Sequence, residues 1–179
     1  MREIEIKFLN IDVQETKKRL KEIGANLEYD ELFEEWLFAR PEWKAKRGRV
    51  RLRKQSNKLL LAYKETLQET SKGNTEIEFE VLNKEAALEF LLKLDFEEPR
   101  YQQKRRIHYV IEDVSVDIDF WPLLPPMIEI EALSLAKAEH VATKLGFTLA
   151  AACNLDAFQI YTTVYNIDIN SITNLVFET

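Results

Sequence analysis

In the opening stretch MREIEIKF, charged residues alternate with apolar ones. Successive side chains of a β-strand point to opposite faces, so Ile4, Ile6 and Phe8 would share one face and the charges the other. The same alternation recurs along the chain, with turn residues between the segments. We therefore expect eight strands, at residues 2–8, 33–39, 49–54, 58–64, 75–81, 104–110, 114–120 and 127–132.

Three other segments carry apolar residues at helical spacing, with capping or turn residues at their ends. They are 12–24, 84–94 after the N-cap Asn83, and the stretch from Ser134 to Gly146. A fourth helical stretch is expected at 156–165, within a tail, 154–179, that is either helical or a covering segment. Helices thus follow the first, fifth and eighth strands, which predicts an α+β fold in a single domain, residues 1–179.

The polar faces of the predicted strands are unusual because formal charges dominate them. Arg49, Arg51 and Arg53 follow one another on the third strand, and three glutamates do so on the fifth. Like charges in line repel unless opposite charges or a ligand lie close. A solvated surface is the simpler explanation for any one strand, but it explains poorly a pattern that only the second strand lacks.

An alternative is an eight-stranded antiparallel β-barrel, or tunnel, with a charged interior and helices packed outside. Buried charges without partners are costly, so a ligand would have to compensate them. Arginine and lysine suit a polyphosphate, whereas clustered carboxylates suit a hard divalent cation such as Mg²⁺ or Mn²⁺. The charged faces therefore predict a site for a polyphosphate chain and its metal.

Composition narrows the choice of function without changing this picture. The net charge of −6 argues against a general binder of nucleic acid or anionic membranes, although a local basic cavity remains possible. The single cysteine, Cys153, allows no internal disulfide and no zinc cluster. No apolar run reaches the roughly 18–20 residues of a membrane span. The alternating charges of the first residues are also unlike the apolar segment of a signal peptide, so none is expected. We expect a cytoplasmic protein.

Six charged motifs follow one another along the predicted strands. They are ExExK at Glu3-Ile4-Glu5-Ile6-Lys7, RxR at Arg51-Leu52-Arg53, a strand-end lysine at Lys64, ExE at Glu76-Ile77-Glu78, KxR at Lys104-Arg105-Arg106, and an acid, Asp119, followed by ExE at Glu129-Ile130-Glu131. In this order they resemble the motifs of the CYTH superfamily, the triphosphate tunnel metalloenzymes. The family's HF pair before ExExK and its glycine-rich LGxF before the last ExE have no counterpart here, which weakens the likeness to class IV adenylate cyclases.

The resemblance implies an antiparallel tunnel that binds a triphosphate with a divalent metal, Mg²⁺ or Mn²⁺. It assigns catalysis to four glutamates, phosphate binding to six basic residues and metal binding to six acids. The catalytic glutamates are Glu3, Glu5, Glu129 and Glu131. The phosphate-binding residues are Lys7, Arg51, Arg53, Lys64, Lys104 and Arg106. The metal-binding acids are Glu3, Glu5, Glu78, Asp119, Glu129 and Glu131.

The resemblance leaves more than one function open. A metal-dependent triphosphatase acting on inorganic, thiamine or nucleoside triphosphate is favoured, with a cyclase that converts ATP to cyclic AMP and pyrophosphate as the alternative. A non-catalytic polyphosphate binder is a third possibility. A small-molecule triphosphate is the expected partner, with no nucleic acid or membrane, in a monomer or homodimer. Asp117 and Glu80 are expected to be wall charges, and His108 a residue at a strand end.

Overall fold

The computed structural model describes residues 4–46, 48–66 and 74–178. Glu3, one of the expected catalytic and metal-binding residues, lies outside the described residues. The chain forms two compact units. The first unit comprises Met1–Glu31 and Arg105–Ile169, and the second comprises Leu32–Lys104 and Asn170–Thr179.

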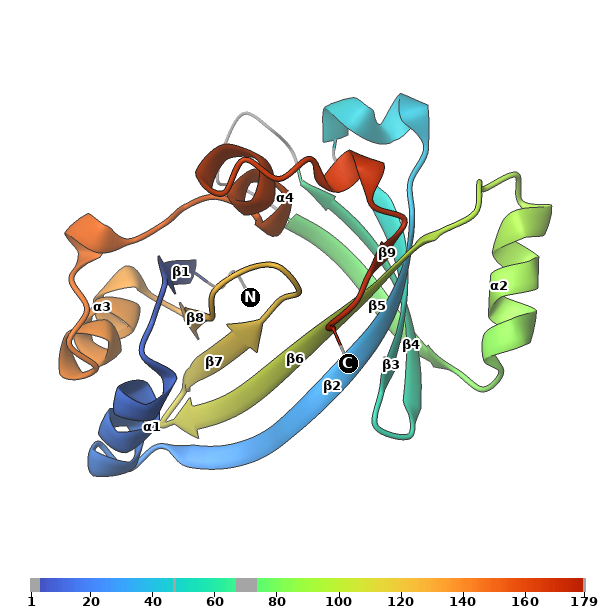
Figure 1. Ribbon diagram of the computed structural model, residues 1–179. Coiled ribbons are helices and arrows are strands. Elements are labelled where there is room, and N and C mark those ends of the chain that lie inside the picture. The colour runs from blue at the N-terminus through green and yellow to red at the C-terminus, as the bar shows by residue number, and fades with distance from the viewer. Residues whose placement is uncertain (1–3, 47, 67–73, 179) are drawn as a thin grey trace. The chain divides into compact units, whose positions relative to one another are not determined.

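The eight strands and four helical segments expected from the sequence are confirmed where the structure describes them (Figure 1). Two strands, β2 and β6, begin earlier than the pattern predicts. Short 3-10 turns lie at Pro41–Lys46, Leu149–Ala151 and Ile169–Ser171, and a π-helical turn, Ile160–Val164, continues the last helix. The elements are β1 (Ile4–Leu9), α1 (Val13–Glu22), β2 (Asn26–Phe38), β3 (Arg49–Gln55), β4 (Lys58–Thr66), β5 (Asn74–Val81), α2 (Lys84–Lys93), β6 (Arg100–Ile111), β7 (Val114–Phe120), β8 (Met127–Ala132), α3 (Leu135–Lys144), α4 (Ala157–Gln159) and β9 (Asn174–Leu175).

The strands form one hydrogen-bonded path in the order β1-β8-β7-β6-β2-β3-β4-β5, and β9 pairs with β6 in parallel. An antiparallel sheet in an α+β fold is thus confirmed. The expected closed barrel is wrong as regards hydrogen bonding, because the path ends at β1 and β5 among the described residues. At the outer edge of β1, the backbone N–H of Cys153 donates to the carbonyl of Lys7 at 2.8 Å. The tail therefore occupies part of the edge that a closing strand would need.

In the first unit, α1 and α3 lie side by side against the apolar face of the sheet (Figure 1). Asp12 caps α1 by accepting hydrogen bonds from the next helical N–H groups, and the fully buried Leu20 anchors the helix in the core. A guanidinium hydrogen bond of 2.9 Å from Arg19 to the carbonyl of Leu145 ties α1 to the end of α3. The helices thus cover the face opposite the charges, as the alternation predicts.

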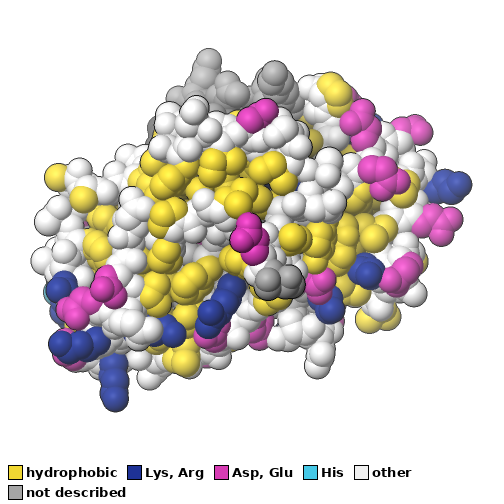
Figure 2. Space-filling view, in the orientation of Figure 1, with side chains coloured by type: hydrophobic (Ala, Val, Ile, Leu, Met, Phe, Trp, Pro, Cys, Tyr) yellow, Lys and Arg dark blue, Asp and Glu magenta, His cyan; other side chains and the backbone are white. Residues whose placement is uncertain are grey.

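In the second unit, α2 begins at the N-cap Asn83 and packs through Leu91 against Phe38 and Phe96. Apolar side chains gather at the surface beside this helix (Figure 2). A depression of about 260 Å³ lies there, lined mainly by aromatic and leucine side chains. Trp36 and Trp43 pack against the same core.

The tail packs closely on the first unit before its end joins the second. Ile160 and Tyr161 are fully buried, and the Tyr161 hydroxyl donates to the carbonyl of Pro122 at 2.6 Å. The Tyr165 hydroxyl donates to the side chain of Asn10 at 2.6 Å. None of the helices in the described part of the chain is long and apolar enough to cross a membrane.

Candidate functional site

The charged residues of the first unit share one face of the sheet because of the strand register. Antiparallel partners point to the same side, so each cross-strand pair links two neighbouring strands on one face. This face carries more acids than bases, and it includes two residues expected to have no special role, Asp117 and His108. The pairs are Glu5 with Glu131, Lys7 with Glu129, Glu129 with Asp117, Asp117 with His108, and Asp119 with Arg106.

Arg106 lies at the centre of this face. Its Nε and one terminal nitrogen donate to Asp119 at 2.7 and 2.6 Å, and the same terminal nitrogen donates to Glu129 at 2.7 Å. The other terminal nitrogen lies 2.5 Å from Asp117. Burial alone would lower the pKa of Arg106, but the carboxylates, Asp119 foremost, raise it well above its usual value. The guanidinium is therefore a permanent cation that holds three carboxylates.

Lys7 is the second cation of the face. It forms ion pairs with Glu5 and with Glu129, the latter at 3.8 Å. Burial opposes its charged form, but Glu129 and Glu5 outweigh burial and raise the pKa of Lys7. Lys7 thus remains protonated at neutral pH.

The donor chemistry of the first unit fits a divalent metal. Among the described residues of the first unit, five carboxylates, counting Glu131, share the face with two permanent cations, Lys7 and Arg106. Carboxylate oxygens are the preferred ligands of Mg²⁺ and Mn²⁺, and the excess negative charge would be offset by such an ion. In the described part of the chain, no group of three or more acidic, histidine or cysteine side chains is arranged around a metal position. Instead, Arg106 occupies the middle of the cluster.

In the second unit, arginine and lysine alternate with glutamate across β3, β4 and β5. Arg51 and Arg53 each contact Glu78, at 3.0 and 3.3 Å. Lys64 contacts Glu76 at 2.7 Å. Burial and the charge of Arg51 lower the pKa of Lys64 and outweigh the effect of Glu76. This face contains the partly desolvated cations that phosphate recognition requires.

Glu35 is a site residue that strand alternation alone did not identify. It lies opposite Arg53 in the β2–β3 register and is 3% exposed. Gln102 donates to it at 2.6 Å, and Arg51 lies 3.6 Å away. Burial would raise the pKa of Glu35, but Arg51 and Lys104 outweigh it and the pKa is lowered. The glutamate therefore offsets the charges of the buried cations around it.

We expect Glu35→Gln to lower the free energy of unfolding by about 3–5 kcal/mol at pH 7, since it removes one partner of a buried charge pair. The pKa of Glu35 is lower in the folded protein than its usual value of about 4.5, so the ionised carboxylate stabilises the fold above that pH. This stabilisation is lost as pH falls through the folded-state pKa. The difference from wild type should therefore shrink below about pH 4.5. Urea unfolding from pH 7 to pH 3 measures it.

The matched control for this prediction is Glu34→Gln on the other face of the same strand. Glu34 pairs with Lys54 at 3.0 Å, and half of the Lys54 side chain is exposed. Exposed pairs contribute less than about 1 kcal/mol, so this variant should change stability little. Equal losses for both variants would contradict the role assigned to Glu35.

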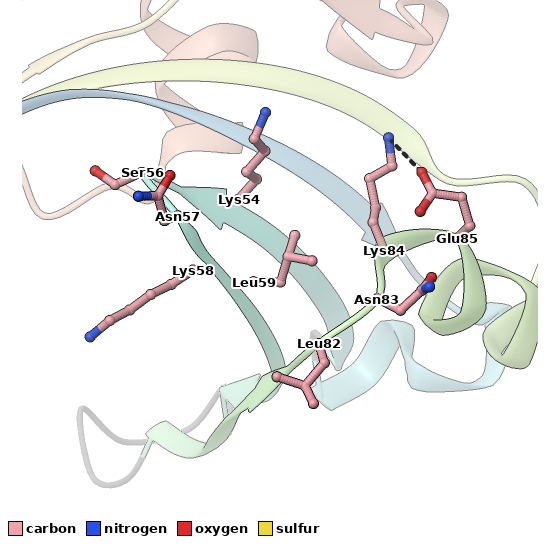
Figure 3. Close-up of a pocket in the computed structure, with 9 residues that line it drawn as sticks. All are labelled: Lys54, Ser56, Asn57, Lys58, Leu59, Leu82, Asn83, Lys84 and Glu85. Atoms are coloured by element: carbon pink, nitrogen blue, oxygen red, sulfur yellow. Dashed lines mark ion pairs between the residues drawn. The ribbon is translucent and has the colours of Figure 1, made fainter.

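A larger depression, of about 420 Å³, lies elsewhere in the second unit (Figure 3). It lies at the turn between β3 and β4 and the start of α2, and Lys54, Lys58 and Lys84 are among the residues that line it. Lys84 forms an ion pair with Glu85 at 3.2 Å. None of the residues that line this depression is an expected site residue. Lys54, which follows Arg53 on β3, points to the opposite face of the sheet.

Comparison with known protein families shows to which family the chain belongs. Residues 1–146 match the CYTH domain family. The chain belongs to the CYTH family. No curated protein sequence matches it, but many solved structures do.

Three solved structures illustrate the CYTH fold of this chain. The PH1012 protein of Pyrococcus horikoshii OT3 has a TM-score of 0.74 and 24% identity, covering 88% of this chain and 98% of that one. A Vibrio parahaemolyticus protein described as a candidate adenylate cyclase has a TM-score of 0.75 and 12% identity, covering 90% and 98%. HpAC1 from Hippeastrum, a candidate adenylyl cyclase described as having a dominant triphosphatase activity, has a TM-score of 0.58 and 14% identity, covering 91% and 96%. At these identities the likeness concerns the fold.

The described CYTH motif residues fall into two groups, one in each unit. Each group mixes acids with bases, and Glu3 lies outside the described residues. His108 lies within β6 rather than at its end, so the expectation of a strand-end residue is wrong. The first unit holds Glu5, Lys7, Arg106, Asp119, Glu129 and Glu131, and the second holds Arg51, Arg53, Lys64, Glu76, Glu78 and Lys104.

Proposed function

We propose that this CYTH protein is a divalent-metal-dependent triphosphatase. The observation that carries the proposal is the carboxylate-rich face of the first unit, where four acids contact Arg106 or Lys7 and Glu131 lies opposite Glu5 on the same face. A site that only bound a polyanion would be hindered by so many carboxylates. Acids in excess of bases are expected where a metal and a polyphosphate bind together.

In this proposal, the basic residues bind phosphate oxygens and the acids hold the metal. Phosphoryl transfer depends mainly on positioning and on neutralising charge, which these side chains provide. When bound, Mg²⁺ or Mn²⁺ would neutralise phosphate charge and lower the pKa of a water molecule. Water adds to the terminal phosphorus, the bond to the bridging oxygen breaks, and orthophosphate and the shortened chain leave. The assigned ligands are Glu3, Glu5, Glu78, Asp119, Glu129 and Glu131, and the phosphate-binding residues are Lys7, Arg51, Arg53, Lys64, Lys104 and Arg106.

Adenylate cyclase chemistry is the second candidate, because one similar structure is described as a candidate adenylate cyclase. The same charged side chains could orient ATP so that its ribose 3′-hydroxyl attacks the α-phosphorus and pyrophosphate leaves. The dominant triphosphatase activity described for the Hippeastrum protein supports hydrolysis as the first choice. In this proposal, the protein acts in the cytoplasm on a small-molecule triphosphate, as a monomer or homodimer.

Product analysis distinguishes these activities. The purified protein is incubated with ATP, thiamine triphosphate or tripolyphosphate, with Mg²⁺ or Mn²⁺, and the products are separated by anion-exchange chromatography. We expect orthophosphate from at least one substrate and no cyclic AMP. Cyclic AMP with pyrophosphate would establish the cyclase instead, and metal-dependent binding without turnover would establish a binding protein.

A further inference from the structure

The arrangement around Arg106 leaves no free edge for a phosphate group. All three guanidinium nitrogens lie against carboxylate oxygens, of Asp119, Glu129 and Asp117. Bidentate binding of phosphate requires two parallel N–H donors directed at the ligand. Arg106 can therefore bind phosphate in this way only after some of its carboxylates have turned elsewhere.

Asp117 contacts a histidine as well as the arginine. Asp117 is 6% exposed in its side chain, and its two oxygens are divided between Arg106, at 2.5 Å, and the Nδ1 of His108, at 2.6 Å. An ionised carboxylate only accepts hydrogen bonds, so Nδ1 is the donor. The ring of His108 stacks on Tyr29, with centroids 4.8 Å apart and planes 19° apart. His108 thus fixes Asp117 from the side away from the arginine.

We propose that Arg106 is the internal counter-ion of the metal-binding carboxylates and competes with the metal for Asp119 and Glu129. His108 and Asp117 are positioning residues that retain the guanidinium when those two carboxylates turn to the metal. The Nε edge of Arg106 then becomes available for phosphate oxygens. This inference rests on the proposed function for its metal and its phosphate, and it requires metal to bind before Arg106 engages the substrate.

A titration with Mn²⁺ alone tests the competition, with free Mn²⁺ measured by electron paramagnetic resonance. Because no triphosphate is present, its outcome is independent of whether the protein turns over any substrate. Arg106→Gln should bind Mn²⁺ on the order of tenfold more tightly than wild type, since the competing cation is gone. Arg106→Lys should bind more tightly to a smaller degree, because one ammonium cannot contact three carboxylates. Unchanged or weaker binding by the folded variants would overturn the proposal.

The matched control is Arg105→Gln. Arg105 is the next residue of β6, and it forms an equally close two-bond pair with Asp30, at 2.7 Å for both bonds. Its partner is not one of the acids of the charged face, so its removal should leave Mn²⁺ affinity unchanged. A gain in affinity equal to that of Arg106→Gln would show a general charge effect and overturn the proposal.

The anchoring role is tested on wild-type protein by following the Nε–H resonance of Arg106 in ¹⁵N-arginine-labelled samples, assigned through Arg106→Lys. Mg²⁺ should shift this resonance in wild type while leaving it visible. In Asp117→Asn and His108→Phe, Mg²⁺ should broaden it through solvent exchange, because the retained anchor is weakened. His108→Asn keeps a donor near the Nδ1 position and should behave as wild type. A resonance insensitive to Mg²⁺ in wild type, or unaltered by Asp117→Asn, would overturn the anchoring role.

Discussion

Glu129→Gln is expected to lower kcat for metal-dependent triphosphate hydrolysis on the order of 10²–10³-fold, the typical cost of removing one electrostatic group from a reaction centre. Glu129 lies between the two cations of its face, 2.7 Å from Arg106 and 3.8 Å from Lys7. Its replacement removes a metal ligand and a charge while keeping the shape of the side chain. Initial rates of orthophosphate release at saturating Mg²⁺ measure the effect.

The fold should survive this substitution, because Asp119 and Asp117 still pair with Arg106. Thermal unfolding of Glu129→Gln should therefore differ little from wild type. The control is Glu34→Gln, whose glutamate lies on the opposite face of β2 from Glu35. This control should retain wild-type kcat. Near-normal turnover in folded Glu129→Gln would remove the glutamate from the proposed catalytic set.

The second large effect is expected for Arg51→Gln, which should raise KM for tripolyphosphate at least about 30-fold. Truncating one partner of a buried, hydrogen-bonded charge pair costs roughly 2–5 kcal/mol, and each 1.4 kcal/mol is about a tenfold change in affinity. The Arg51 side chain is 13% exposed and contacts Glu35, Glu76 and Glu78. Steady-state kinetics should show a larger change in KM than in kcat, because the residue is assigned to phosphate binding.

Lys54→Gln is the matched control for Arg51. It removes a positive charge from the same strand, β3, but on the opposite face, where Lys54 pairs with Glu34. KM should stay within about twofold of wild type, as expected for an exposed pair. Equal increases in KM for both variants would indicate a general loss of positive charge rather than a specific contact.

The strands and the positions of most charged side chains could be predicted because both depend on local alternation. Glu5 and Lys7 share a face whatever their partners are, since the period of a strand is two. The register that sets Lys7 opposite Glu129 follows from longer-range pairing, which one sequence does not encode locally. The shared face was therefore predictable, whereas the particular ion pairs were not.

Glu35 and His108 show where the pattern was insufficient. Glu35 is flanked by Glu34 and Trp36, so its strand lacks the strict alternation that marks the others. Only its register with Arg53 places it on the charged face. His108 shares strand parity with Arg106, but its contact with Asp117 depends on the β6–β7 pairing. Parity with a charged neighbour was the signal available in the sequence for His108.

Closure of the sheet could not be predicted from strand patterns either. The pairing of Cys153 with Lys7 at the edge of β1 joins residues far apart in the sequence, and neither residue carries a local signal for it. Backbone groups at a strand edge pair with whatever segment the tail brings to them.

The organisation as one domain, residues 1–179, stays a prediction.

The central claim is that this CYTH protein hydrolyses a triphosphate with the help of a divalent metal. Phosphorus NMR of tripolyphosphate incubated with the wild-type protein tests it most directly, first with Mg²⁺ or Mn²⁺ and then after excess EDTA. We predict that orthophosphate and pyrophosphate appear together while metal is present and that their formation stops on chelation. Intact tripolyphosphate after incubation with either metal, or equal hydrolysis after chelation, would contradict the claim for this substrate, and the same result with ATP and thiamine triphosphate would contradict it altogether.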